Sequence, residues 1–258
     1  MGEQSPAVGC GAVRQAWRRA GLGSVALAVA LGTAACEVPS FGAPDPASRE
    51  GSRIFSLWQG FFLAACAVGA FMLVLILYTL LRYRARGSDR IPMQGSVNVP
   101  AEVIYTATPI LIVAVLFTLS FSRERSVTKV SSTPGEVVRV TAFQWGWEFH
   151  YPAEGVTITG SGNSPGPELV LPAGVTTHLE LISHDVIHSF YVPQFLEKRD
   201  LVPGLDNAID VTPTRTGVFA GRCAEYCGLD HWRMDFSARV LPEPEFRQWA
   251  KAQQAAKP

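Results

Sequence analysis

The chain has 258 residues, with 22 basic and 22 acidic side chains, and 48% of its residues are hydrophobic. A formal net charge of zero argues against a nucleic-acid-binding protein, because such proteins present a basic surface to phosphates. The apolar residues are not spread evenly along the chain, and their longest runs lie in its first half, which indicates membrane segments.

The first residues have the pattern of a secretory signal. A start with three arginines precedes an apolar run over residues 21–35, which is short for a membrane span and ends in small residues before Cys36. Cys36 is either the lipid-acceptor cysteine of a lipoprotein or part of an ordinary cleavage site, since Thr33 stands where a larger aliphatic residue is usual. We therefore interpret residues 1–36 as a signal peptide and residues 37–53 as an external N-terminal segment.

Two long runs without charged side chains follow, over residues 54–81 and 103–122. A helix needs roughly 20 apolar residues to cross a bilayer, so the runs predict a transmembrane helical hairpin over residues 54–122. The loop between them carries four arginines against the single Asp89, and such an excess of basic residues belongs on the cytoplasmic side. Everything after residue 122 is therefore expected on the outer face of the membrane.

Residues 123–241 are predicted to form an external all-β domain. Short runs rich in β-branched residues alternate with glycine and proline turn signals, which is typical of an antiparallel sandwich or barrel. Residues 242–258 are predicted to be a C-terminal helix and tail, because apolar residues recur there at helical spacing. The expected strands cover residues 137–143, 156–159, 168–171, 176–181 and 207–211, with two more near 218–219 and 238–240.

Metal-ligating side chains are concentrated late in this domain, where Cys223, Cys227, His231 and Met234 lie within twelve residues. Two thiols, an imidazole and a thioether are soft or borderline donors, which favour copper over magnesium or calcium. His188 offers a second imidazole from a separate loop. A single blue copper needs only one cysteine, so the second thiol suggests two coppers sharing both sulfurs. A disulfide or a zinc site is the alternative, but neither explains the methionine.

The pattern Cys-x-Glu-x-Cys-x-x-x-His-x-x-Met, preceded by Asp-Val-x-His-Ser, resembles that of subunit 2 of haem-copper cytochrome c oxidases. The resemblance implies a Greek-key cupredoxin barrel and a binuclear, mixed-valence copper A centre bridged by Cys223 and Cys227. One copper would be completed by His188 and Met234, and the other by His231 and a backbone carbonyl.

Two carboxylates match the family pattern as well. Glu225 supplies the backbone carbonyl that would complete the second copper. By the resemblance, its side chain contributes to a magnesium or manganese site shared with subunit 1. The alternative is an exposed loop carboxylate. Glu102, at the cytoplasmic entry of the second helix, matches a glutamate at the mouth of a proton channel in subunit 1. The alternative is a charge that favours the start of a helix.

Trp145 and Asp185 are the residues expected to support electron transfer. Trp145 lies in a Gln-Trp-x-Trp stretch that resembles the family's electron-entry segment. The alternative is one continuous strand over residues 143–149 whose aromatic rings fill the core, unless Gly146 turns one ring outward. Asp185, three residues before His188, is expected either to orient that imidazole or to cap a turn.

The resemblance implies an electron-transfer subunit of a respiratory oxidase in a bacterial cell membrane. It would accept electrons from cytochrome c, or from a tethered haem c donor, and pass them to haem in subunit 1. Subunit 1 would reduce oxygen to water and pump protons, and subunit 3 and the lipid bilayer are further expected partners. The alternatives are a membrane-anchored copper carrier and the copper A subunit of a nitrogen-oxide reductase. A quinol oxidase subunit would need no copper.

Overall fold

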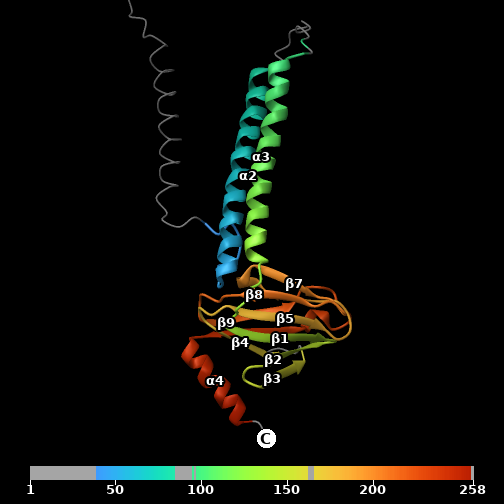
Figure 1. The fold of residues 1–258 in the computed structure, drawn as a ribbon. Helices are drawn as coiled ribbons and strands as arrows, with labels where there is room; N and C mark the ends of the chain where they lie inside the picture. The colour runs from blue at the N-terminus through green and yellow to red at the C-terminus, as the bar shows by residue number, and fades with distance from the viewer. Residues whose placement is uncertain (1–38, 85–94, 96, 162–165, 257–258) are drawn as a thin grey trace, which may run out of the picture. The chain divides into compact units, whose positions relative to one another are not determined.

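The computed structural model describes residues 39–84, 95, 97–161 and 166–256. The predicted signal peptide, including Cys36, lies outside the described residues, as does most of the basic loop on which the membrane orientation rests. The described chain contains two long helices, a β-domain and a C-terminal helix (Figure 1).

The two long helices are α2 (Arg49–Arg82) and α3 (Val99–Val127), which run side by side (Figure 1). Both are long and apolar enough to cross a bilayer, and their large apolar side chains are exposed along most of their length, as suits helices that contact lipid. The predicted pair of membrane-capable helices is confirmed. Each helix continues beyond its uncharged run at the outer end, into charged residues suited to water.

The outer end of α2 is hydrogen-bonded to the β-domain. The backbone N–H of Arg49 donates to the Thr212 carbonyl at 2.9 Å, and the buried Glu50 carboxylate accepts from the Thr212 N–H at 2.8 Å. Gly51 allows a close approach, because a Cβ there would lie 2.7 Å from the Phe195 carbonyl oxygen. The helix therefore begins against the domain that carries the candidate metal ligands.

The β-domain consists of two five-stranded sheets, in the orders β3-β2-β1-β5-β8 and β4-β10-β9-β6-β7. The expected sandwich is confirmed, but it is not purely antiparallel, because β1 pairs with β5 and β10 with β4 in parallel. Parallel neighbours require a crossover connection. Between β1 and β5 along the chain, the crossover passes through β4, which belongs to the second sheet. The strands are β1 (Glu136–Phe143), β2 (Gly146–Tyr151), β3 (Val156–Ser161), β4 (Glu168–Pro172), β5 (Thr177–Ser183), β6 (His188–Val192), β7 (Glu197–Leu201), β8 (Asn207–Val211), β9 (Gly217–Cys223) and β10 (Asp235–Leu241).

The aromatic segment 143–149 is not one continuous strand. β1 ends at Phe143, residues 144 and 145 form a turn, and β2 begins at Gly146. A Cβ at Gly146 would lie 2.5 Å from the Gly160 carbonyl oxygen of β3, so only glycine fits there. The alternative of an uninterrupted core strand was therefore wrong: Trp147 is buried, whereas Trp145 is only partly buried at the end of the hairpin.

Buried aromatic rings form the part of the core next to the segments that carry the candidate metal ligands. Trp147, Phe190 and Phe236 are at most 2% exposed, and the rings of Phe190 and Trp147 each lie 5.1 Å from that of Phe236. The indole N–H of Trp147 donates to the carbonyl of Met234 at 3.3 Å, so the core fixes the backbone at one predicted ligand.

The expected C-terminal helix is present as α4 (Glu243–Ala255), and it packs on the β-domain through its buried Phe246. Arg247 of this helix lies 3.3 Å from a Glu136 oxygen and 3.2 Å from a Glu154 oxygen. Burial and the neighbouring Glu154 raise the pKa of the Glu136 carboxyl to about 7.

Candidate metal centre

The β9–β10 hairpin brings the late cysteine-rich segment together. Cys223 is the last residue of β9, and Met234 directly precedes β10. The two strands pair antiparallel, and the Cys223 N–H donates to the Met234 carbonyl at 3.0 Å. Cys227 and His231 lie in the loop between them, with His231 opening a short 3₁₀ helix (His231–Arg233). The predicted placement of this segment between two strands is confirmed.

His188 reaches the same place from a neighbouring strand. It was expected in a loop, but it is the first residue of β6. β6 pairs with β9 in the register Phe190 opposite Cys223, and the Ala224 N–H donates to the Ser189 carbonyl at 3.0 Å. Strand pairing, rather than a flexible loop, therefore brings His188 beside the cysteines.

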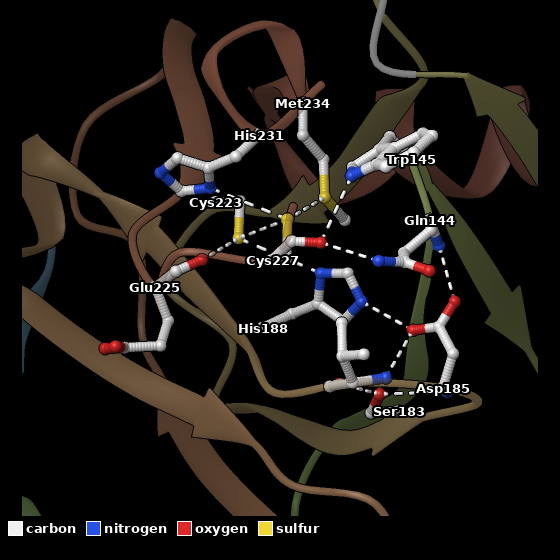
Figure 2. Close-up of polar contacts among 11 residues, drawn as sticks. Gln144, Trp145, Ser183, Asp185, His188, Cys223, Glu225, Cys227, His231 and Met234 are labelled. Atoms are coloured by element: carbon white, nitrogen blue, oxygen red, sulfur yellow. Dashed lines mark hydrogen bonds and ion pairs between the residues drawn. The ribbon is translucent and has the colours of Figure 1, made fainter. Parts of the chain in front are cut away.

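The side-chain donors converge in Figure 2. The ligand atoms of His188, Cys223 and Cys227 lie within 4.8 Å of one another. The two Sγ atoms are 3.9 Å apart, and His188 Nδ1 is 3.9 Å from Cys223 Sγ. His231 Nδ1 and Met234 Sδ lie 3.5 Å and 3.7 Å from Cys227 Sγ. The five side chains that the sequence singled out therefore gather around the two sulfur atoms of the cysteines.

The chemistry of this donor set fits copper. Cys223, Cys227, His188 and Met234 are buried, and the two cysteines are free thiols. The backbone carbonyl of Glu225 adds an oxygen 3.2 Å from Cys223 Sγ. Zinc would be satisfied by two cysteines and two histidines, whereas a fully buried thioether turned toward the thiols is a copper-type ligand.

The two thiols have opposite tendencies to ionise. Burial disfavours the thiolate of Cys223, but the hydrogen bond with His188 and backbone contacts outweigh it and lower the pKa of Cys223. Burial and the adjacent Cys223 raise the pKa of Cys227 to about 12. Without a metal the pair therefore retains a proton at neutral pH. A metal that binds both sulfurs as thiolates must displace that proton, so metal binding depends on pH.

Asp185 fixes the orientation of His188. Its Oδ1 accepts from His188 Nε2 at 2.8 Å and from the Val186 N–H at 2.7 Å, so both expected contacts are present. Its Oδ2 accepts from the Gln144 N–H at 2.6 Å. Partial burial opposes ionisation, but these hydrogen bonds outweigh it and lower the pKa of Asp185. The ring is thereby turned so that Nδ1 faces Cys223.

The carboxylates of Glu225 and Glu102 do not join the cluster. The Glu225 side chain points away from the sulfur atoms in Figure 2 and accepts a hydrogen bond from Lys198 Nζ at 3.0 Å. Glu102 lies in the first turn of α3, where its Oε1 accepts from the Asn98 N–H at 3.1 Å, a helix-capping contact.

Trp145 contacts the cluster through the backbone of Cys227. Its indole N–H donates to the Cys227 carbonyl at 3.2 Å, while its ring is only partly buried. The sequence analysis did not identify two residues that contact Trp145 and Cys227. Gln144 Nε2 donates to the same carbonyl at 2.7 Å, and Gly228, with φ +118°, allows both side chains to approach. The only signal for either was adjacency to a predicted site residue.

The ligand loop also carries exposed apolar side chains. Tyr226, Leu229 and Trp232 are 77%, 81% and 76% exposed. Large apolar groups this exposed beside a buried site are typical of a protein–protein contact surface.

The chain is similar in sequence to known proteins. Residues 165–240 match the family model described as cytochrome C oxidase subunit II, periplasmic domain. A probable cytochrome c oxidase subunit 2 of Streptomyces avermitilis is 38% identical over 263 residues, covering 87% of this chain and 82% of that protein. Cytochrome c oxidase subunit 2 of Mycobacterium tuberculosis is 30% identical over 304 residues, covering 95% of this chain and 83% of that protein. The solved periplasmic domain of subunit II of cytochrome oxidase from Bradyrhizobium japonicum is 29% identical, with a TM-score of 0.45, and covers 49% of this chain and 98% of that one. With copper-type donors at one point and relatives of this identity over most of its length, the chain belongs to the cytochrome c oxidase subunit 2 family.

Proposed function

We propose that this chain is the electron-entry subunit of a bacterial respiratory oxidase and holds a binuclear copper A centre. The observation that carries the proposal is the convergence of five buried or half-buried soft donors, with two thiols 3.9 Å apart at the centre. When bound, the pair of coppers would supply one-electron chemistry with the electron shared between both ions. The proposed ligands are Cys223, Cys227, His188, His231, Met234 and the backbone carbonyl of Glu225.

The β-framework keeps these donors in place. Electron transfer is faster when ligand geometry changes little between oxidation states, so rigid supports favour it. Asp185 fixes the imidazole of His188, and the Trp147 indole holds the backbone of Met234. The Cys223 N–H is bonded across the hairpin to the Met234 carbonyl. His188 and Met234 are thus held by residues outside the ligand set, and Cys223 and Met234 are held to each other across the hairpin.

Trp145 is proposed as the residue through which electrons enter. Its partly buried ring lies at the end of the β1–β2 hairpin, and a single hydrogen bond links it to the carbonyl of a proposed bridging cysteine. The exposed Tyr226, Leu229 and Trp232 provide an apolar contact surface nearby for cytochrome c, a tethered haem c donor or subunit 1. Membership of the cytochrome c oxidase subunit 2 family favours an oxidase subunit over a copper carrier or a nitrogen-oxide reductase subunit.

Glu225 and Glu102 are proposed to act at the boundaries with subunit 1. The Glu225 carboxylate is a hard oxygen donor turned away from the sulfur cluster, as a magnesium or manganese ligand shared with subunit 1 would be. Its present partner is the ammonium of Lys198, a cation that a divalent ion would replace. Glu102 stands at the start of α3, the expected cytoplasmic entry, where it would lie at the mouth of a proton channel of subunit 1. Subunit 3 and lipid complete the proposed partners.

The Trp145→Phe variant of the assembled oxidase tests the entry role. It removes the indole N–H but keeps an aromatic ring, so we expect unchanged copper content and copper spectra with sharply slower reduction by cytochrome c in stopped-flow measurements. The matched control is Trp249→Phe in α4, on the C-terminal helix away from the ligand loops. A wild-type reduction rate in Trp145→Phe would reject the assignment.

A further inference from the structure

We propose that Gln144 is a positioning residue for the copper loop, the β9–β10 segment that carries Cys227. It holds Trp145 against this loop and thereby shifts the equilibrium between oxidised and reduced copper. The inference rests on the proposed function, since it assumes copper at Cys227 and electron entry at Trp145. Gln144 itself is exposed and offers no ligand atom turned toward the thiols. Its contribution lies in what it is bonded to.

The first support is a shared acceptor. Gln144 Nε2 and Trp145 Nε1 both donate to the carbonyl oxygen of Cys227, at 2.7 Å and 3.2 Å. This uses both lone pairs of one carbonyl on a proposed bridging ligand. The amide donor therefore keeps the indole beside Cys227 and draws electron density from the backbone of that ligand.

The second support is the backbone of the same residue. The Gln144 N–H donates to Asp185 Oδ2 at 2.6 Å, and Asp185 Oδ1 is hydrogen-bonded to His188 Nε2 at 2.8 Å. One residue of the β1–β2 turn is thus bonded both to the segment that leads into β6 and to the β9–β10 loop. Figure 2 shows this chain of contacts from Cys227 through Gln144 and Asp185 to His188.

The third support is the absence of a side chain at Gly228. A Cβ there would lie 3.1 Å from Gln144 Nε2 and 3.2 Å from Trp145 Cζ2, closer than ordinary contact. The φ of +118° also disfavours any other residue. The copper loop is therefore shaped so that the Gln144 amide and the Trp145 ring can lie directly on it, which a merely solvated glutamine would not require.

The role depends on the N–H donor, and this makes it testable by substitutions of similar size. Gln144→Leu removes the donor, and Gln144→Glu replaces it with a carboxylate that repels the Cys227 carbonyl. Both keep the backbone N–H that bonds to Asp185. Loss of the N–H donor leaves the Cys227 carbonyl dipole uncompensated beside the site, and its negative end favours the more positively charged, oxidised centre. We expect the equilibrium with a fixed electron donor to shift toward oxidised copper by about two- to tenfold, the size of one net hydrogen bond.

The experiment uses the assembled oxidase, with Gln248→Leu as the matched control, because Gln248 is exposed and lies on α4, outside the segments that carry the proposed ligands. Copper content and the hyperfine pattern are measured first, followed by a mediated redox titration and the rate of reduction by cytochrome c. We expect both Gln144 variants to keep wild-type copper content while showing the shifted equilibrium and slower reduction. The control should match wild type in every measurement.

Two results would overturn the inference. One is a wild-type redox equilibrium and reduction rate in both Gln144 variants. The other is loss of copper from both variants while the circular dichroism stays native, because a positioning residue adjusts the site and does not hold the metal. Failure of the proposed function looks different, since the wild-type protein itself would then lack a two-copper signal.

Discussion

Replacing Asp185 with alanine should weaken copper binding without unfolding the β-domain. The carboxylate accepts the His188 Nε2 hydrogen bond at 2.8 Å and also bonds to the backbone N–H groups of Gln144 and Val186. Outer carboxylates that orient a ligating histidine contribute about 10- to 100-fold in metal affinity. This corresponds to about 1.4–2.8 kcal/mol. The side chain is partly exposed, so its removal leaves no large cavity and the loss should appear in affinity rather than in stability.

The assay is a competition for copper between the purified full-length chain and a chelator of known affinity, with circular dichroism as the folding check. Asp185→Asn should fall between wild type and Asp185→Ala, because its amide oxygen still accepts from His188 but carries no charge. Asp206→Ala is the control, since Asp206 is exposed and has no hydrogen bond or ion pair within the described part of the chain. Equal copper affinity in Asp185→Ala and wild type would refute the argument that His188 needs this support.

Three further outcomes are expected. Met234→Leu should keep copper bound but shift its redox equilibrium and slow turnover, as followed by mediated titration; wild-type kinetics would count against a ligand role. Glu225→Gln should weaken a manganese signal in electron paramagnetic resonance of the complex and leave the copper signal intact, and an unaltered manganese signal would argue against that site. The folded state raises the pKa of Glu136 to about 7 and so binds its proton more tightly than the unfolded state. The contribution of this group to stability is therefore largest in acid and falls as pH rises from about 4.5 to 7. Glu136→Gln should remove this decline in the free energy of unfolding and stabilise the outer domain at pH 8 by up to about 3 kcal/mol. Urea unfolding at pH 5 and pH 8 measures the effect. An unchanged decline would show that Glu136 does not cause it.

The sequence predicted well the features that depend on residues close together along the chain. The membrane-capable helices follow from two runs without charge, and four of the donors lie within residues 223–234 because one β-hairpin loop carries them. His188 was recognisable by its chemistry, but its position in a strand was not, since a short segment after a turn gives no periodicity to read.

The features that were not predicted arise from contacts between distant residues. Gln144 is separated from Cys227 by 83 positions, and Lys198 from Glu225 by 27, so neither pairing leaves a local pattern. The turn at Trp145 was ambiguous because alternating aromatics also describe a core strand, and the close approach of β3 to Gly146 decided between them. The parallel pairing of β1 with β5 likewise depends on a crossover that strand propensity cannot show.

The central claim is that two thiols hold two coppers as one redox unit, and electron paramagnetic resonance of the copper-loaded protein tests it most directly. A copper nucleus has spin 3/2, so an electron shared equally by two coppers gives a seven-line hyperfine pattern. We expect that pattern together with two coppers per chain. A four-line spectrum with one copper per chain, or a disulfide between Cys223 and Cys227 in the active complex, would contradict the account.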